Sequence, residues 1–188
     1  GLARISGTQI KRVDNQDGLP ESGVLSLARD ASDRLWVAMG RKGLFREDRP
    51  GQFVKVPESP RPWVLAAAPK HGGLFVFGPQ DQVGFFKGDT LTQTWTRQDG
   101  VGLEPAAALE DAQGRLWVLD RIGLFYKGLE DKRFRAFPHP VVAPGGQTRN
   151  LVSDGQGGVW VATVSGLLHI QGDTYQALGA STGLPTRY

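Results

Sequence analysis

The chain has 188 residues, of which 39 % are hydrophobic and 22 % charged, so it carries enough apolar sequence to bury the core of one ordinary domain. Its 26 glycines and 12 prolines argue against a mainly helical protein and favour short strands joined by turns. The net charge of +3 is scattered, which argues against a nucleic-acid surface, and without an apolar run of about 18 residues this segment is not expected to insert into a membrane.

Taken from the N-terminus, the first predicted element is a pair of strands within residues 1–13, which align with residues 166–178 near the other end. Four groups of strands follow. First strands are predicted at 24–30, 63–69 and 148–154, second strands at 35–39, 116–119 and 159–162, and fourth strands at 52–56, 92–97, 133–137 and 174–178. A third strand is expected to open at each of Gly43, Gly84, Gly123 and Gly166.

These groups are copies of one repeat. Each second strand carries an aromatic anchor, and the anchors of copies one to four are Trp36, Phe75, Trp117 and Trp160. A segment resembling "DGLP" recurs at 17–20, 99–105 and 182–185. A period of about 41 residues in a glycine-rich chain is typical of a β-propeller blade. We therefore predict an all-β fold of four-stranded antiparallel blades, in a partial array of roughly four.

The turn before each anchor has a fixed chemistry. Asp30, Asp111 and Asp154 stand six residues before the anchors of copies one, three and four, where a carboxylate can accept backbone N–H bonds within the turn. Copy two is degenerate, because Pro69 replaces the aspartate. Three residues after this position, a glycine or Asp33 is expected to need a positive φ. Because they recur, the aspartates and tryptophans are interpreted as structural.

The second strands are apolar at consecutive positions rather than at alternate ones, as in Leu35–Met39, Leu116–Leu119 and Val159–Ala162. Such a strand is buried on both faces. A blade packed between two neighbouring blades supplies both faces, so the composition of these strands supports the same fold.

The segment 17–48, "DGLPESGVLSLARDASDRLWVAMGRKGLFRED", resembles the two-component regulator propeller repeat. The matching residues of copy one are Gly18, Leu19, Pro20, Val24, Leu27, Asp30, Leu35, Trp36, Val37, Gly43 and Leu44. The resemblance implies an extracytoplasmic, periplasmic sensor domain of a membrane-anchored bacterial signalling protein with a histidine kinase or diguanylate cyclase output. It also implies a small-molecule ligand such as a carbohydrate, and dimerisation.

The repeat divides the chain into one propeller segment with predicted internal boundaries. These are 1–16 for the outer strands of a preceding blade, 17–58, 59–98, 99–139 and 140–181 for four blades, and 182–188 for the next connector. Four and a half blades are not expected to form a closed propeller ring by themselves. Either further blades of a longer parent chain or a homodimer partner is expected to complete the ring.

The sequence offers no catalytic or metal-binding motif. The three histidines, His71, His139 and His169, have no metal-ligand spacing, and the glycine-rich "GQGG" at 155–158 lies in a hairpin turn without the helix that a phosphate site needs. With no cysteine and no serine in a nucleophile elbow, covalent catalysis is unsupported. We expect no enzyme activity, no cofactor and no metal.

Function in a repeat protein belongs where the copies differ. The loops expected on one face are the turns between second and third strands and the connectors into each first strand. The ligand-binding candidates there are Arg41, Arg61, Trp63, Glu104, Arg121, Arg149 and Asn150. An aromatic ring beside planar hydrogen-bonding groups suits a sugar or an anionic small molecule.

Ligand sensing without catalysis is therefore the predicted function. One alternative is a non-catalytic interaction or dimerisation scaffold. Another is an enzyme resembling the streptogramin lyases, which would need a histidine and a carboxylate converging on a central channel; the histidines here do not lie at equivalent channel positions.

Overall fold

The computed structural model describes residues 1–57, 59, 61–79, 82–102, 104–121, 123–128, 130–138, 150–163 and 166–184. The chain forms two compact units. Unit 1 comprises Gly1–Ala67 and Gly72–Thr94, and unit 2 comprises Ala68–His71 and Trp95–Tyr188. In the part that the structure describes, no helix is long and apolar enough to cross a membrane.

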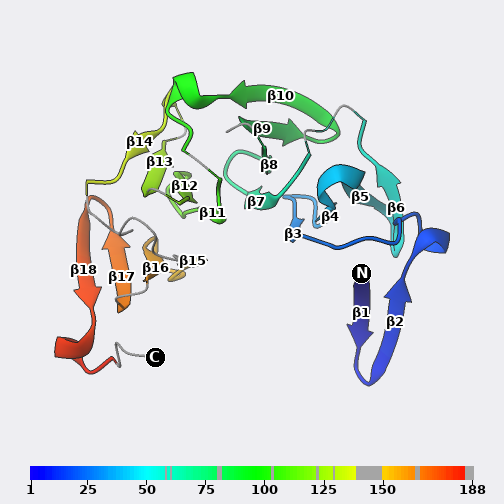
Figure 1. Ribbon diagram of the computed structural model, residues 1–188, viewed down its shortest axis with the longest axis horizontal. Coiled ribbons are helices and arrows are strands. Elements are labelled where there is room, and N and C mark those ends of the chain that lie inside the picture. Colours follow the sequence, from blue (N-terminus) through cyan, green and yellow to red (C-terminus); the bar gives the residue numbers. More distant parts are fainter. Residues whose placement is uncertain are drawn as a thin grey trace. The chain divides into compact units, whose positions relative to one another are not determined.

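Unit 1 holds a two-stranded hairpin followed by two four-stranded sheets (Figure 1). The hairpin is β1 (Leu2–Ser6) and β2 (Gln9–Val13), and it is followed by the 3-10 helix η1 (Asn15–Asp17). The first sheet contains β3 (Ser26–Arg29), β4 (Leu35–Ala38), β5 (Leu44–Arg49) and β6 (Gln52–Lys55), with η2 (Gly40–Lys42) between β4 and β5. The second contains β7 (Val64–Ala68), β8 (Gly73–Gly78), β9 (Gln82–Lys87) and β10 (Thr90–Trp95).

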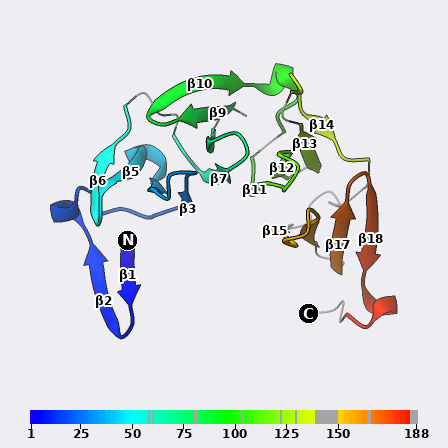
Figure 2. The ribbon, with the colours of Figure 1, turned by 180° about the vertical axis from the view of Figure 1, so that it is seen from behind.

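Unit 2 holds two further four-stranded sheets, whose outer hairpins are visible from behind in Figure 2. After η3 (Arg97–Asp99) come β11 (Ala107–Glu110), β12 (Leu116–Leu119), β13 (Leu124–Lys127) and β14 (Arg135–Ala136). The last sheet contains β15 (Asn150–Ser153), β16 (Val159–Thr163), β17 (Gly166–Gln171) and β18 (Thr174–Leu178), followed by η4 (Ala180–Thr182). Each sheet keeps its strands in chain order, which confirms the predicted four-stranded antiparallel blades.

Burial on both faces of the second strand is confirmed in β4. Trp36 and Ala38 belong to a core cluster with Leu65 and Leu74 of the next sheet. The intervening residues Val37 and Met39 belong to a different cluster, which includes the hairpin residue Val13. The strand therefore lies between two apolar layers, and this explains why its apolar residues are consecutive.

The predicted backbone of the repeated turn is also confirmed. Asp33 has a φ of 61°, and the glycines at the same place in the other copies, Gly72, Gly114 and Gly157, have φ values of 72°, 79° and 101°. Only in copy one does a residue with a side chain adopt this conformation, and aspartate is among the residues that tolerate it best.

The recurring "DGLP" segment has a specific local structure. Asp14 caps η1 by accepting from the backbone N–H of Gln16, and Asp17 accepts in return from the N–H of Asp14. Gly18 follows with a φ of 89°, and a Cβ there would collide with the carbonyl oxygen of Phe53 on β6. The glycine therefore lets the connector lie directly against the outer strand of the blade that it enters.

Three expectations needed correction. The third strand of copy two was expected to open at Gly84, but β9 begins at Gln82 and Gly84 lies within it. The fourth strand expected at 133–137 is reduced to Arg135–Ala136. Trp160, expected to be a core residue like Trp36 and Trp117, is only partly buried.

Candidate ligand-binding site

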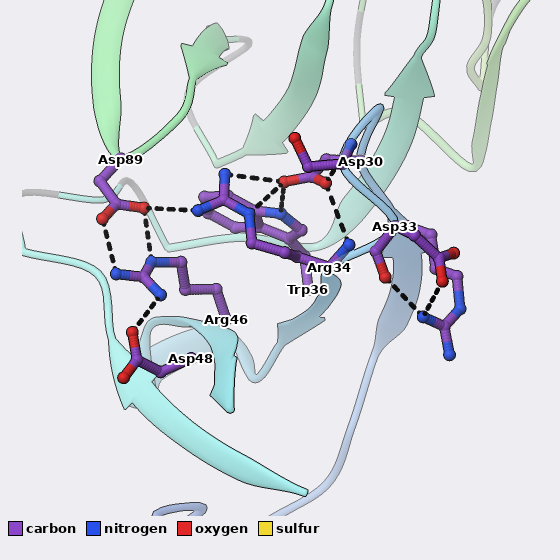
Figure 3. Close-up of polar contacts among 9 residues, drawn as sticks. Asp30, Asp33, Arg34, Trp36, Arg46, Asp48 and Asp89 are labelled. Atoms are coloured by element: carbon purple, nitrogen blue, oxygen red, sulfur yellow. Dashed lines mark hydrogen bonds and ion pairs between the residues drawn. The ribbon is translucent and has the colours of Figure 1, made fainter. Parts of the chain in front are cut away.

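The carboxylate of Asp30 accepts hydrogen bonds from its own turn and from the strand that follows it (Figure 3). Oδ1 of Asp30 accepts from the backbone N–H groups of Ser32 at 2.8 Å and Arg34 at 3.1 Å. Oδ2 accepts from Arg34 Nε at 2.9 Å and from Trp36 Nε1 at 2.8 Å. Burial raises the pKa of Asp30, but these hydrogen bonds outweigh it and hold the pKa below its ordinary value of 3.8.

Copy three repeats this arrangement closely. Asp111 accepts from Arg115 Nε at 2.7 Å and from Trp117 Nε1 at 2.8 Å, and its carboxylate is completely buried. The guanidinium of Arg115 also lies over the Trp117 ring, 5.0 Å from its centroid. In both copies the indole N–H donates to the turn aspartate, so neither group remains available to bind a ligand.

In copies two and four a different side chain covers the anchor ring. The arginine of the turn is replaced by Gly73 and Gly158, and the ring of the facing residue on the third strand covers the anchor instead. Phe85 packs on Phe75 with ring centroids 4.8 Å apart. In copy four His169 stacks on Trp160.

His169 also changes the hydrogen bonding of the fourth turn. Its Nε2 lies 2.8 Å from Asp154 Oδ2, the oxygen that the anchor indole occupies in copies one and three. The bond from His169, followed by backbone bonds from Gln156 and Gly158, lowers the pKa of Asp154. Trp36 and Trp117 are buried against the sheet that follows their own, in clusters with Leu65 and Leu151. In the described part of the chain no sheet follows that of Trp160, so its ring is only partly buried.

The histidines have structural surroundings where they are described. His71 pairs with Glu110, whose carboxylate is fully buried and also accepts from the backbone N–H of Lys70 at 2.7 Å. His169 pairs with Asp154, and His139 lies outside the described residues. Within the described ranges, no group of three or more ligating side chains could hold a metal ion.

The turn network of unit 1 borders an open hollow of about 310 Å³. It is lined by Arg4, Arg29, Asp33, Arg34, Glu47, Asp48, Arg49 and Pro50. Charges of both signs alternate there, and Asp33 already pairs with Arg29 at 3.3 Å (Figure 3). Because the positive and negative charges of the hollow offset one another, it is a weaker candidate for ligand binding than the surface at the opposite ends of the strands.

At the ends of the strands opposite the repeated turns, copies one to three each have an equivalent, exposed residue directly before the first strand. The backbone N–H of Leu25, Trp63 and Ala106 donates to the carbonyl oxygen two residues after the anchor of its own copy, at 2.9, 2.7 and 2.8 Å. Leu25 is 56 % exposed and Trp63 is 38 % exposed. The copies therefore present leucine, tryptophan and alanine at one position, which is the kind of variation that a binding surface requires.

In unit 1 this position adjoins the turn between second and third strands. The backbone N–H of Gly40 donates to the carbonyl of Pro62 at 3.2 Å, which ties η2 to the connector before β7. The side chain of Leu25 lies against Gly40, at 3.1 Å from where a Cβ would stand. Arg41 and Lys42 follow Gly40, and Arg61 and Trp63 flank the buried Pro62.

We call this surface the Trp63 site and define it by Leu25, Arg41, Lys42, Arg61 and Trp63. Its three cations are exposed, and none of them forms an ion pair with another residue in the described part of the chain. The sequence had indicated Arg41, Arg61 and Trp63, which the backbone contacts bring together. It missed Leu25, because an exposed leucine at the start of a strand looks like a core residue.

The other predicted residues belong to unit 2. Arg121 Nε and Glu104 Oε2 lie 3.9 Å apart, and both side chains are mostly exposed. Asn150 is exposed, and its side-chain oxygen accepts from the backbone N–H of Leu151 at 2.9 Å. Arg149 lies outside the described residues. The described residues therefore place the predicted candidates in two separate groups, one in each unit.

No family model matches the chain, and no curated protein matches it by sequence. Solved structures do resemble it. Virginiamycin B lyase from Staphylococcus aureus superposes with a TM-score of 0.76 at 12 % identity, over 94 % of this chain and 62 % of the lyase. The chain thus spans less than two thirds of that enzyme.

Two extracellular domains from B. thetaiotaomicron are similar as well. That of a candidate one-component system gives a TM-score of 0.73 at 16 % identity, over 92 % of this chain and 27 % of the other. That of a candidate hybrid two-component system gives 0.70 at 16 % identity, over 94 % of this chain and 25 % of the other. At sequence identities this low, the similarity shows a shared fold.

Together, the four-stranded antiparallel sheets and these neighbours confirm the predicted fold class. Extracellular domains of two-component systems stand among the neighbours, which is what the resemblance to the regulator propeller repeat predicted. The chain is therefore a β-propeller protein by fold, built of the blades that its repeat encodes and sharing their architecture with two-component sensor domains.

Proposed function

We propose that this chain is part of a periplasmic, ligand-sensing propeller of a bacterial signal-transduction receptor, and that it binds a saccharide through the Trp63 site. The observation that supports this is the exposed Trp63 at a position where copies one and three have leucine and alanine. A flat indole face is well suited to pack on the C–H face of a sugar ring, while neighbouring guanidinium groups donate to its hydroxyls.

The backbone around Trp63 supports recognition by a preformed surface. The N–H of Trp63 is fixed by the carbonyl of Phe77, and the adjoining Pro62 is buried and accepts from Gly40. Backbone that is already fixed at Pro62 and Trp63 loses little conformational entropy on binding, which favours affinity. In the proposed receptor, further blades of the parent chain or a second copy would complete the propeller, and the parent would be anchored in the membrane.

The structural similarity to virginiamycin B lyase suggests a lyase activity as the alternative function. This activity receives less support from the described residues, because His71 is bonded to Glu110 and His169 to Asp154. If the alternative were right, virginiamycin B would be consumed by the chain; we expect chromatography to show the antibiotic unchanged.

The experiment for the proposal is binding of the 188-residue chain to a panel of neutral and acidic oligosaccharides, with Trp63→Ala as the test variant. Tyr175→Ala is the matched control, since Tyr175 is an aromatic residue of unit 2 with 47 % exposure. We expect Trp63→Ala to lose at least about tenfold in affinity and Tyr175→Ala to bind normally. Absence of saccharide binding, or equal effects of the two variants, would favour the scaffold alternative.

A further inference from the structure

The Trp63 site carries an unbalanced positive charge. Arg41, Lys42 and Arg61 are exposed, and in the described part of the chain no carboxylate pairs with any of them. Arg46, by contrast, pairs with Asp48 and Asp89 within the same unit. Three unmatched cations therefore stand around Trp63.

The corresponding surface of unit 2 shows what a balanced version looks like. Arg121, in the turn after β12, faces Glu104 of the preceding connector, with Nε and Oε2 3.9 Å apart. The exposed residue that starts its first strand is Ala106 instead of a tryptophan. The aromatic platform and the unmatched cations thus occur together in unit 1, and neither is present at the described equivalent place in copy three.

We infer that the ligand of the Trp63 site is an acidic saccharide, one whose rings carry carboxylate groups as uronic acids do. This inference rests on the proposed function and specifies its ligand class. A guanidinium binds a carboxylate with two parallel hydrogen bonds, which a neutral hydroxymethyl group cannot reproduce. Arg41 and Arg61 supply such groups on two segments that the bond from Gly40 to Pro62 holds together.

The aromatic and cationic parts of the site have separable roles. Trp63 and Leu25 offer apolar area to any sugar ring, so they set affinity for neutral and acidic forms alike. The cations discriminate between the two forms, because the charged form gains ion pairs from them in addition to the hydrogen bonds that both forms accept. Being exposed, they act through screened interactions, and the preference for the acid must weaken as ionic strength rises.

The test compares two probes of equal size, a tetramer of galacturonic acid and its methyl ester, which removes the charges and keeps the rings. Isothermal titration calorimetry with the 188-residue chain should give a Kd for the acid roughly tenfold below that for the ester. The preference should shrink as NaCl is raised from about 0.05 M to about 0.5 M.

Two triple variants locate the effect. In Arg41→Gln/Lys42→Gln/Arg61→Gln the ratio of the two dissociation constants should fall to about one, because the acid loses its ion pairs while both probes lose the same hydrogen bonds. Arg4→Gln/Arg49→Gln/Lys87→Gln removes the same charge from exposed positions of unit 1 outside the site and should keep the preference. Circular dichroism checks that both variants remain folded.

The outcomes separate this inference from the proposed function. If both probes bind equally and Trp63→Ala abolishes both, saccharide recognition stands and the acidic class is wrong. If the control triple variant loses the preference as fully as the test variant, the effect is one of net charge and the assignment to this site is wrong. If neither probe binds and the neutral panel also fails, both proposals fall.

Discussion

His169 lies parallel to Trp160, with ring centroids 4.0 Å apart and an interplanar angle of 12°. The two residues face each other across β16 and β17, where copies one and three have an arginine and a tyrosine opposite the anchor. Glycine at residue 158 leaves room for this stack, since a Cβ there would stand 2.9 Å from His169 Nε2. In copy three the third strand also covers the anchor, because Tyr126 stacks on Trp117 while Arg115 of the turn lies over the same ring.

Gly158→Ala should therefore destabilise the fold. A Cβ at this position would collide with the Asp154 carboxylate and stand 2.8 Å from the Ile170 carbonyl oxygen and 2.9 Å from His169 Nε2. We expect a loss of about 1–3 kcal/mol in the free energy of unfolding, as for other overpacked sites. Gly23→Ala is the control, since nothing lies within 4 Å of its Cβ position. Equal denaturant midpoints for the two variants would refute this reading of Gly158.

Asp111→Ala should be more damaging than removal of an exposed acid. It would leave Trp117 Nε1 and Arg115 without their buried acceptor, so a loss of about 3 kcal/mol in unfolding free energy is expected. Asp173→Ala, at a carboxylate that is 95 % exposed, should change stability by less than about 0.5 kcal/mol. Urea unfolding of both variants measures the difference, and similar midpoints would contradict a structural role for the buried acid.

Stability should fall in acid because of the turn aspartates. The folded-state pKa values of Asp30 and Asp154 are lowered, so each contributes stability that is fully present above the ordinary pKa of 3.8. That contribution is lost as the pH falls through the lowered folded-state value. Asp30→Asn should accordingly be less stable than wild type at neutral pH, and the two unfolding free energies should converge in acid. Parallel curves from neutral pH down to about pH 2 would show that Asp30 is not linked to folding.

The pair Arg46 and Asp89 should be energetically coupled. The guanidinium meets both carboxylate oxygens, at 2.6 Å and 2.5 Å, and the Arg46 side chain is only 15 % exposed (Figure 3). A double-mutant cycle with alanine should give a coupling of about 1 kcal/mol. The exposed pair Arg135 and Asp131, at 3.1 Å, serves as the reference and should give less than about 0.5 kcal/mol. A coupling no larger than that of the reference pair would be inconsistent with a specific clamp between the two sheets of unit 1.

Much of the fold could be predicted from local patterns, since the physics of a blade is local. The consecutive apolar residues of Leu35–Ala38 indicated burial on both faces, and the two clusters around Trp36 and Val37 agree. The positive φ of Asp33 followed from its alignment with glycines. Turn chemistry and strand composition act within a few residues, so a repeat read in register is sufficient to place them.

The candidate site was only half predictable. Arg41, Arg61 and Trp63 could be selected as variable loop residues, but their assembly depends on the bond between Gly40 and Pro62, which joins segments far apart in the chain. The partial exposure of Trp160 was missed because burial of an anchor depends on the sheet that follows it, as Trp117 packs with Leu151 of the last sheet. His169 of the third strand also bonds Asp154 Oδ2, the carboxylate oxygen to which the indole donates in copies one and three. Sequence thus determined which elements form. Tertiary structure decided which side chains compete for one acceptor or share one surface, because that depends on distances across strands and between sheets.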